Sequence, residues 1–171
     1  MTLTDAEMTA LLAPAGLRFI RRWDDGEVRL PALPPGYGPA SALPEHGRFD
    51  APADEIADVN APEMPEKVNT GWFRMAATYG LFDSDREFLL GVNYAGPDEE
   101  PASHHAWAQV RLLDDWDLVA SEVDQLRSWF AALFTTRFVP EFSAVSLDGR
   151  TSLTTTVWGN GTVSSIAIRP S

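Results

Sequence analysis

Hydrophobic and polar positions alternate along several segments of the chain with the period of two that is typical of β-strands. Segment 17–23, for example, carries its large apolar side chains on one face and arginines on the other. Turn residues separate the runs, among them the Asn160-Gly161 pair, which favours a hairpin. The pattern predicts about eight strands, over residues 17–23, 27–30, 70–81, 87–94, 103–113, 142–147, 151–158 and 162–169.

Two helices are also predicted. A short one follows Thr4, which together with Glu7 has the spacing of a capping box, and it ends before Pro14. A longer one begins at Asp114 and extends to about residue 134, because five apolar residues recur at intervals of three and four: Val119, Val123, Leu126, Phe130 and Leu133. The sequence therefore predicts an α+β fold, a largely antiparallel sheet with a short N-terminal helix and one long helix after the central strands.

Residues 31–65 differ in character, because they hold most of the 13 prolines. Proline lacks a backbone donor and has a fixed φ, so this stretch cannot form central strands and disfavours long helices. We interpret it as a long loop, which in a compact domain is usually functional or mobile. The chain length of 171 residues lies within the usual range for one domain, so we expect residues 1–171 to form a single domain that contains this loop.

Charge and cysteine content narrow the function. The chain has 25 acidic and 13 basic residues and a formal net charge of −12, which argues against nonspecific binding to nucleic acid or to anionic membranes. The same charge favours association with a basic protein surface. The absence of cysteine excludes disulfides and thiolate chemistry. No signal peptide or long apolar run is present, so the expected location is the cytoplasm.

No common catalytic or cofactor motif occurs in the sequence. A P-loop, a dinucleotide-binding fingerprint and a nucleophile elbow are all missing, so no cofactor is predicted. If the adjacent His104 and His105 lie on the predicted strand, their side chains point to opposite faces and cannot chelate one ion, whereas at the start of a loop after Pro101 they could. Acidic clusters lack the spacing of a calcium loop, so no metal site is predicted either.

The C-terminal part of the chain resembles a known layout. From His105 to Arg169 the order is a strand, a group of acids, a predicted helix over 118–134, and strands joined by glycine-containing hairpins. This layout covers about a third of the chain and is similar to that of WapI-type immunity proteins and related uncharacterised actinobacterial domains. The resemblance implies a partner protein and assigns a role to no individual residue.

Two functions remain open. The first is an acidic protein-binding domain of the immunity or inhibitor type, which acts on a basic protein partner. Its expected interface comprises Asp98, Glu99, Glu100, Asp114 and Asp115, with Trp107 as an aromatic anchor. The second is a small-molecule-binding protein or a cofactor-independent enzyme. Its cavity would lie in the sheet beneath the 31–65 loop, with His104, Tyr79 and Tyr94 as polar groups. Charge and the missing catalytic motifs favour binding over catalysis.

Overall fold

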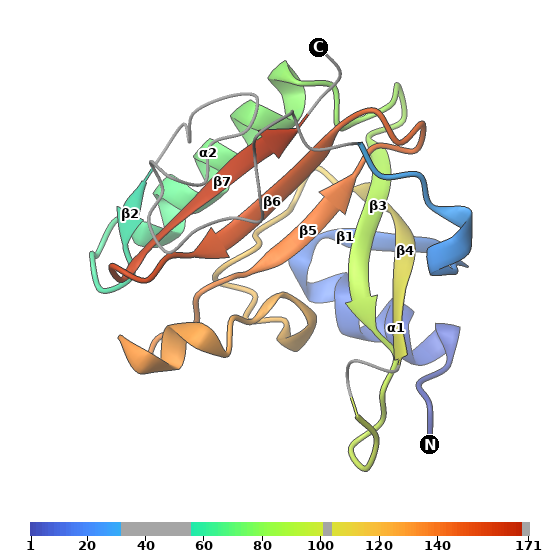
Figure 1. The fold of residues 1–171 in the computed structure, drawn as a ribbon, viewed down its shortest axis with the longest axis horizontal. Coiled ribbons are helices and arrows are strands. Elements are labelled where there is room, and N and C mark those ends of the chain that lie inside the picture. The colour runs from blue at the N-terminus through green and yellow to red at the C-terminus, as the bar shows by residue number, and fades with distance from the viewer. Residues whose placement is uncertain (32–55, 101–103, 169–171) are drawn as a thin grey trace.

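The computed structural model describes residues 1–31, 56–100 and 104–168 (Figure 1). Most of the predicted proline-rich loop, residues 32–55, lies outside the described residues. The expectation that this loop covers a cavity in the sheet therefore falls on residues that the structure does not describe. In the part of the chain that is described, no helix has the length and apolar character needed to cross a lipid bilayer.

Seven strands form one antiparallel sheet in the order β1-β4-β3-β5-β6-β7-β2. The α+β class and the largely antiparallel sheet are thereby confirmed, and six of the predicted strands are present within a few residues of their expected bounds. The seven strands are β1 (Leu17–Trp23), β2 (Ala57–Asp58), β3 (Glu87–Asn93), β4 (His105–Leu112), β5 (Phe142–Val145), β6 (Ser152–Val157) and β7 (Thr162–Ile168).

The short N-terminal helix, α1 (Asp5–Leu12), is confirmed together with its capping box. The Thr4 hydroxyl accepts a hydrogen bond from the Glu7 backbone N–H at 3.1 Å, and the Glu7 carboxylate accepts one from the Thr4 backbone N–H at 3.4 Å. These bonds satisfy donors that the first turn of a helix leaves unpaired. A short 3₁₀ turn (Ala13–Ala15) follows, and Gly16 with a φ of 80° leads directly into β1.

The predicted strand over 70–81 is wrong, because the segment belongs to the long helix α2 (Met64–Thr78). Pro65 stands in the first turn, where its missing N–H costs nothing. Val68, Trp72 and Met75 are buried and recur at helical spacing, so one stripe of the helix faces the sheet. The predicted strand over 27–30 is also absent. A 3₁₀ turn (Asp25–Glu27) follows β1 instead, and β1 remains at the edge of the sheet.

The predicted helix over 114–134 is also wrong. This segment contains turns, two short 3₁₀ helices (Asp124–Leu126 and Phe130–Leu133) and an isolated bridge from Arg127 to Pro140. Oδ1 of Asp117 accepts hydrogen bonds from the backbone N–H groups of Val119 and Ala120, and these bonds compete with helix formation. Glu122 has a φ of 50°, which a regular helix does not tolerate. The apolar residues with helical spacing are therefore held by separate turns.

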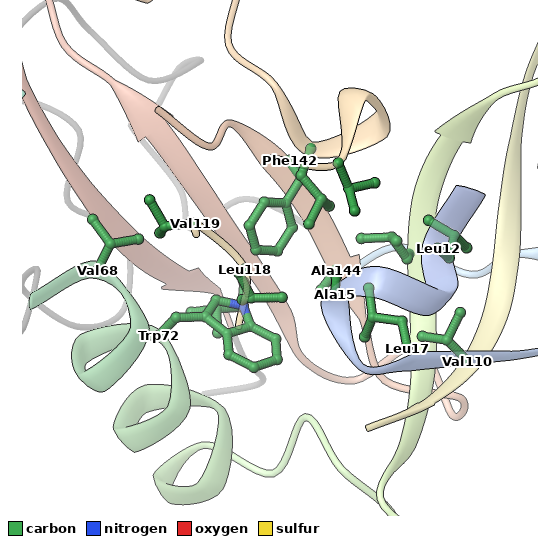
Figure 2. Packing of buried hydrophobic residues seen from close by; sticks show 14 of the residues in the cluster. Leu12, Ala15, Leu17, Val68, Trp72, Val110, Leu118, Val119, Phe142 and Ala144 are labelled. Atoms are coloured by element: carbon green, nitrogen blue, oxygen red, sulfur yellow. The ribbon is translucent and has the colours of Figure 1, made fainter. Parts of the chain in front are cut away.

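The main hydrophobic core lies on one face of the sheet, beneath α1, α2 and the 114–140 segment. Figure 2 shows Trp72 of α2 at its centre, near Leu118 and Phe142. The Trp72 ring is fully buried, and its centroid lies 5.7 Å from that of Phe88 and 6.0 Å from that of Phe142. Tilted ring contacts of this kind add to the stabilisation from apolar burial. Trp72 thus joins the long helix to two central strands.

The opposite face of the sheet carries a smaller apolar cluster. Leu89 of β3, Trp107 of β4 and Val145 of β5 are buried there, with Trp23 and Val28 packed against them. Beside this cluster, a chain of polar side chains crosses three strands on the same face. The Trp23 indole N–H donates to Gln109 (3.0 Å), and both Gln109 (2.8 Å) and Arg111 (2.7 Å) donate to Glu87.

Candidate functional site

The most exposed large aromatic side chain in the described residues is that of Trp129, which directly precedes the 3₁₀ helix Phe130–Leu133. Trp129 and Leu133 are each 76% exposed and Phe130 is 40% exposed. We refer to these three residues as the 129–133 patch. Large apolar side chains that gather in this way on a surface mark interaction sites more often than scattered ones do.

Hydrogen bonds fix the base of the 129–133 patch to the sheet. The Ser128 hydroxyl accepts from the Ala131 backbone N–H (3.1 Å) and donates to Oε1 of Glu141 (3.0 Å). The other carboxylate oxygen of Glu141 accepts from the Thr156 hydroxyl and from the Val157 backbone N–H, both at 2.9 Å. Because β6 is thereby joined to the turn below Trp129, the patch stands on an ordered base.

Phe134 secures the far end of the same turn. Its ring packs over Gly161, where a β-carbon would lie 3.4 Å from the Phe134 ring, and its carbonyl accepts a hydrogen bond from Asn60 (3.1 Å). On the near side, the Arg127 guanidinium lies 5.8 Å from the Trp129 ring centroid and pairs with the exposed Asp124 at 3.0 Å. The arginine beside the patch is therefore already paired with an acid of the same chain.

The acids expected at an interface do not form one surface. Asp98, Glu99 and Glu100 lie in the connection between β3 and β4, whereas Asp114 and Asp115 follow the end of β4. The eight residues of β4 separate the two groups by roughly 25 Å. Asp114 is fully exposed and pairs with Arg86 at 3.1 Å.

Glu99 serves the fold itself. Its carboxylate accepts hydrogen bonds from the backbone N–H of Gly96 (2.9 Å) and the hydroxyl of Thr2 (3.2 Å), and it lies 3.0 Å from Nε2 of His104 and 3.6 Å from the N-terminal amine. The Gly96 N–H is the main reason why the pKa of Glu99 is lowered. Asp98 and Glu100 beside it are exposed. Of the three acids, Glu99 is the one that closes the N-terminus onto the β3–β4 connection.

Trp107 lies inside the protein and not at its surface. It is 6% exposed, and its indole N–H donates to Oδ1 of Asp25 at 2.9 Å. A buried ring whose donor is occupied cannot anchor a partner without unfolding its surroundings. The 129–133 patch supplies the exposed tryptophan that the sequence interpretation sought at Trp107.

The residues of the alternative pocket are divided between two ends of the sheet. Tyr94 and His104 are neighbours, since the Tyr94 N–H donates to the His104 carbonyl at 2.9 Å. Tyr94 is buried, its hydroxyl donates to Asp5 (3.1 Å), and burial raises its pKa. Tyr79 follows α2, and its carbonyl accepts from the Thr151 hydroxyl (2.7 Å) near the start of β6, at the other end of the sheet.

A different cavity exists beside His105. β5 pairs with β3 only at Leu89 and Leu90, so the two strands separate beyond that point. A cavity of about 250 Å³ lies where they separate, and we call it the Gly91 cleft. Its lining residues are Gly91, Val92, Asn93, His105, Gln125, Phe142 and Ser143.

His105 is held in position over this cleft. Its Nδ1 lies 2.9 Å from Oδ1 of Asp25, and the edge of its ring contacts Trp107 at a centroid distance of 5.2 Å. Nε2 lies 3.3 Å from the point where Gly91 would carry a β-carbon. Asp25, His105 and Ser143 were not predicted as a group. A glycine within a run of apolar strand residues is the sequence signal for such a close approach.

A larger hollow of about 670 Å³ lies along α2, between the helix and Trp116. Phe73 stacks on Trp116 at its edge, with ring centroids 5.5 Å apart. Within the described ranges, no three His, Asp or Glu side chains are grouped as a metal site would require.

Comparisons with protein-family models, with curated proteins and with solved structures find no match to this chain. No residue role is therefore transferred from a relative. The resemblance to WapI-type immunity proteins stays a prediction, and one element of that layout, the helix over 118–134, is absent from the structure.

Proposed function

We propose that this chain is an acidic protein-binding domain of the immunity or inhibitor type, and that it docks on a basic protein partner through the 129–133 patch. The observation that carries the proposal is the 76% exposure of both Trp129 and Leu133 on a hydrogen-bonded base. Tryptophan is enriched among the residues that dominate binding energy, and an ordered base reduces the entropy lost on binding.

Charge favours a basic partner over a second copy of the chain. At a net charge of −12, two copies repel each other at long range, whereas a basic protein is attracted. The arginine beside the patch does not reverse this preference, because the charge of Arg127 is paired with that of Asp124.

The test is to identify a partner and reconstitute the complex from purified components. Tagged wild-type protein and the double variant W129A/L133A are used to capture proteins from the source organism, and the products of neighbouring genes are co-expressed with both. The control is L11A/L113A, which removes two leucines that are 38% and 41% exposed outside the patch. We expect a basic protein whose purified complex is weakened at least 30-fold by W129A/L133A and little by L11A/L113A.

Two further measurements show whether the 129–133 patch binds a basic protein or a second copy of the chain. Raising the salt concentration weakens association with a basic partner, because charge attraction is screened. Sedimentation of the isolated protein shows whether copies self-associate. A dimer that W129A/L133A abolishes, or a partner whose affinity is unchanged by this variant, would overturn the proposal.

A further inference from the structure

We propose that the Gly91 cleft binds a primary carboxamide. This inference is independent of the 129–133 patch and concerns a different surface. It rests on the hydrogen-bonding groups that face the cleft, on what each of them already binds, and on the missing side chain at Gly91.

His105 presents an acceptor to the cleft. An ionised carboxylate only accepts hydrogen bonds, so the bond between Asp25 and Nδ1 requires the imidazole proton to be on Nδ1. When the imidazole is neutral, this tautomer carries a lone pair on Nε2, the atom that lies above Gly91. The Trp107 indole donates to the same Asp25 oxygen and helps to fix this carboxylate. The orientation of the imidazole is therefore set by groups outside the cleft.

Asn93 and Ser143 add hydrogen-bonding groups to the cleft that can still accept a partner. Oδ1 of Asn93 accepts from the Ala95 backbone N–H at 2.8 Å, which leaves the two donors on Nδ2. The Ser143 hydroxyl makes no hydrogen bond to the residues that the structure describes, and it can act as donor or acceptor. Gln125, by contrast, is occupied at both ends, because its amide pairs with the backbone N–H (2.9 Å) and carbonyl (2.8 Å) of Asn93.

A primary carboxamide carries in one planar group both a donor for His105 and an acceptor for Asn93 or Ser143. Its N–H donates to Nε2 of His105, and its carbonyl accepts from Nδ2 of Asn93 or from the Ser143 hydroxyl. A carboxylate or an ester lacks the donor and so cannot make the hydrogen bond to Nε2 of His105 that an amide makes. Phe142 and Val92 provide apolar walls for the remainder of the ligand.

The size of the cleft sets the size of the ligand. At about 250 Å³ it is smaller than the pockets that bind drug-sized molecules, so it suits one ring or one amino-acid side chain. A carboxamide of this size comes from two sources, a small free molecule or an Asn or Gln side chain of another protein. Both use the same hydrogen bonds.

The experiment follows backbone amide shifts by NMR as probes are added at neutral pH. Benzamide represents the free planar molecule, and N-acetylglutamine methylamide represents the protein side chain. Benzoate and methyl benzoate keep the ring and lack the N–H donor. We expect saturable shifts at Gly91 and His105 with the better amide, at a dissociation constant of about 1 mM, and binding at least tenfold weaker with benzoate and methyl benzoate. Which amide binds more tightly identifies the source.

Three variants test the geometry. Gly91→Ala places a methyl group 3.3 Å from Nε2 of His105 and is expected to abolish the shifts, while a strand alanine keeps the fold. H105A removes the acceptor from an exposed position and is expected to weaken benzamide about tenfold. Ser152→Ala on the neighbouring strand β6 serves as the control, because its strand partner Val145 does not line the cleft. Equal binding of amide and ester, retention of binding by G91A, or no binding of either amide would overturn the proposal.

Discussion

The Ser128 hydroxyl donates a hydrogen bond to Oε1 of Glu141 at 3.0 Å, and this bond joins the turn beneath Trp129 to the sheet. Glu141 also accepts from Thr156 and from the Val157 N–H. Glu141→Ala leaves these donors without their acceptor, so we expect the free energy of unfolding to fall by about 2 kcal/mol in urea denaturation. Glu100→Ala, which removes an exposed carboxylate in the connection between β3 and β4, is expected to leave the midpoint unchanged. Equal loss in the two variants would contradict the anchoring role of Glu141.

Trp72 and Trp129 provide a matched comparison of the same side chain in two environments. Trp72 is fully buried among aromatic rings, so Trp72→Ala is expected to lower the free energy of unfolding by about 3–5 kcal/mol. Trp129→Ala changes it by less than about 0.5 kcal/mol, because its ring is already 76% exposed. Thermal and urea unfolding of both variants measure the difference. A large loss in Trp129→Ala would show that the ring packs within the domain.

Glu87 makes the stability of the protein depend on pH. The hydrogen bond from Arg111, followed by that from Gln109, holds the pKa of Glu87 below its usual value of about 4.3. A lowered pKa in the folded state contributes stability above the unfolded-state value, and this stability is lost as the pH falls below about 5 through the folded-state pKa. We expect Glu87→Gln to be less stable than wild type at pH 7 and to lose less of its stability between pH 5 and pH 3.

This dependence is measured by urea denaturation at several pH values. Glu100→Gln is the matched variant, because Glu100 is exposed. It should retain the wild-type acid dependence. Parallel curves for wild type and Glu87→Gln would refute the contribution of Glu87.

Glu99 and Glu100 are adjacent in sequence and differ in role. Glu99→Ala removes the acceptor of the Gly96 N–H and the partner of the N-terminal amine. We expect hydrogen exchange at Gly96 to become faster by about tenfold or more, because this amide loses the bond that protects it. Glu100→Ala should leave the exchange rate at Gly96 unchanged. Similar rates in the two variants would mean that Glu99 does not close the N-terminus onto this turn.

Most strands were predictable because their signals are local. The capping box at Thr4 and the Asn160-Gly161 turn each depend on neighbouring residues, and both lie where the sequence placed them. The segment over 70–81 was misassigned although Trp72, Met75 and Ala76 are buried at helical spacing. Its threonines and aromatic residues favour strands, and tertiary packing overrode that preference.

The candidate sites were less predictable. Phe130 and Leu133 fit the spacing of a helix that faces the core, but hydrogen bonds to Asp117 and the conformation of Glu122 break that helix, so these side chains lie at the surface. Trp107 and Trp129 cannot be distinguished by residue type alone. The pair formed by Asp25 and His105 spans 80 residues of sequence, and no local pattern reveals it.

The two-residue strand β2 pairs with β7, the last strand in the sequence, so Ala57 lies opposite Val163 although roughly a hundred residues separate them. Closing so long a loop is slow, because the chain loses conformational entropy before the contacts that offset this loss have formed. This edge of the sheet is therefore expected to assemble late, after the local hairpins. Until then α2 lacks its main neighbour in the sheet, which is β7. During that interval the newly synthesised chain is open to proteolysis and aggregation.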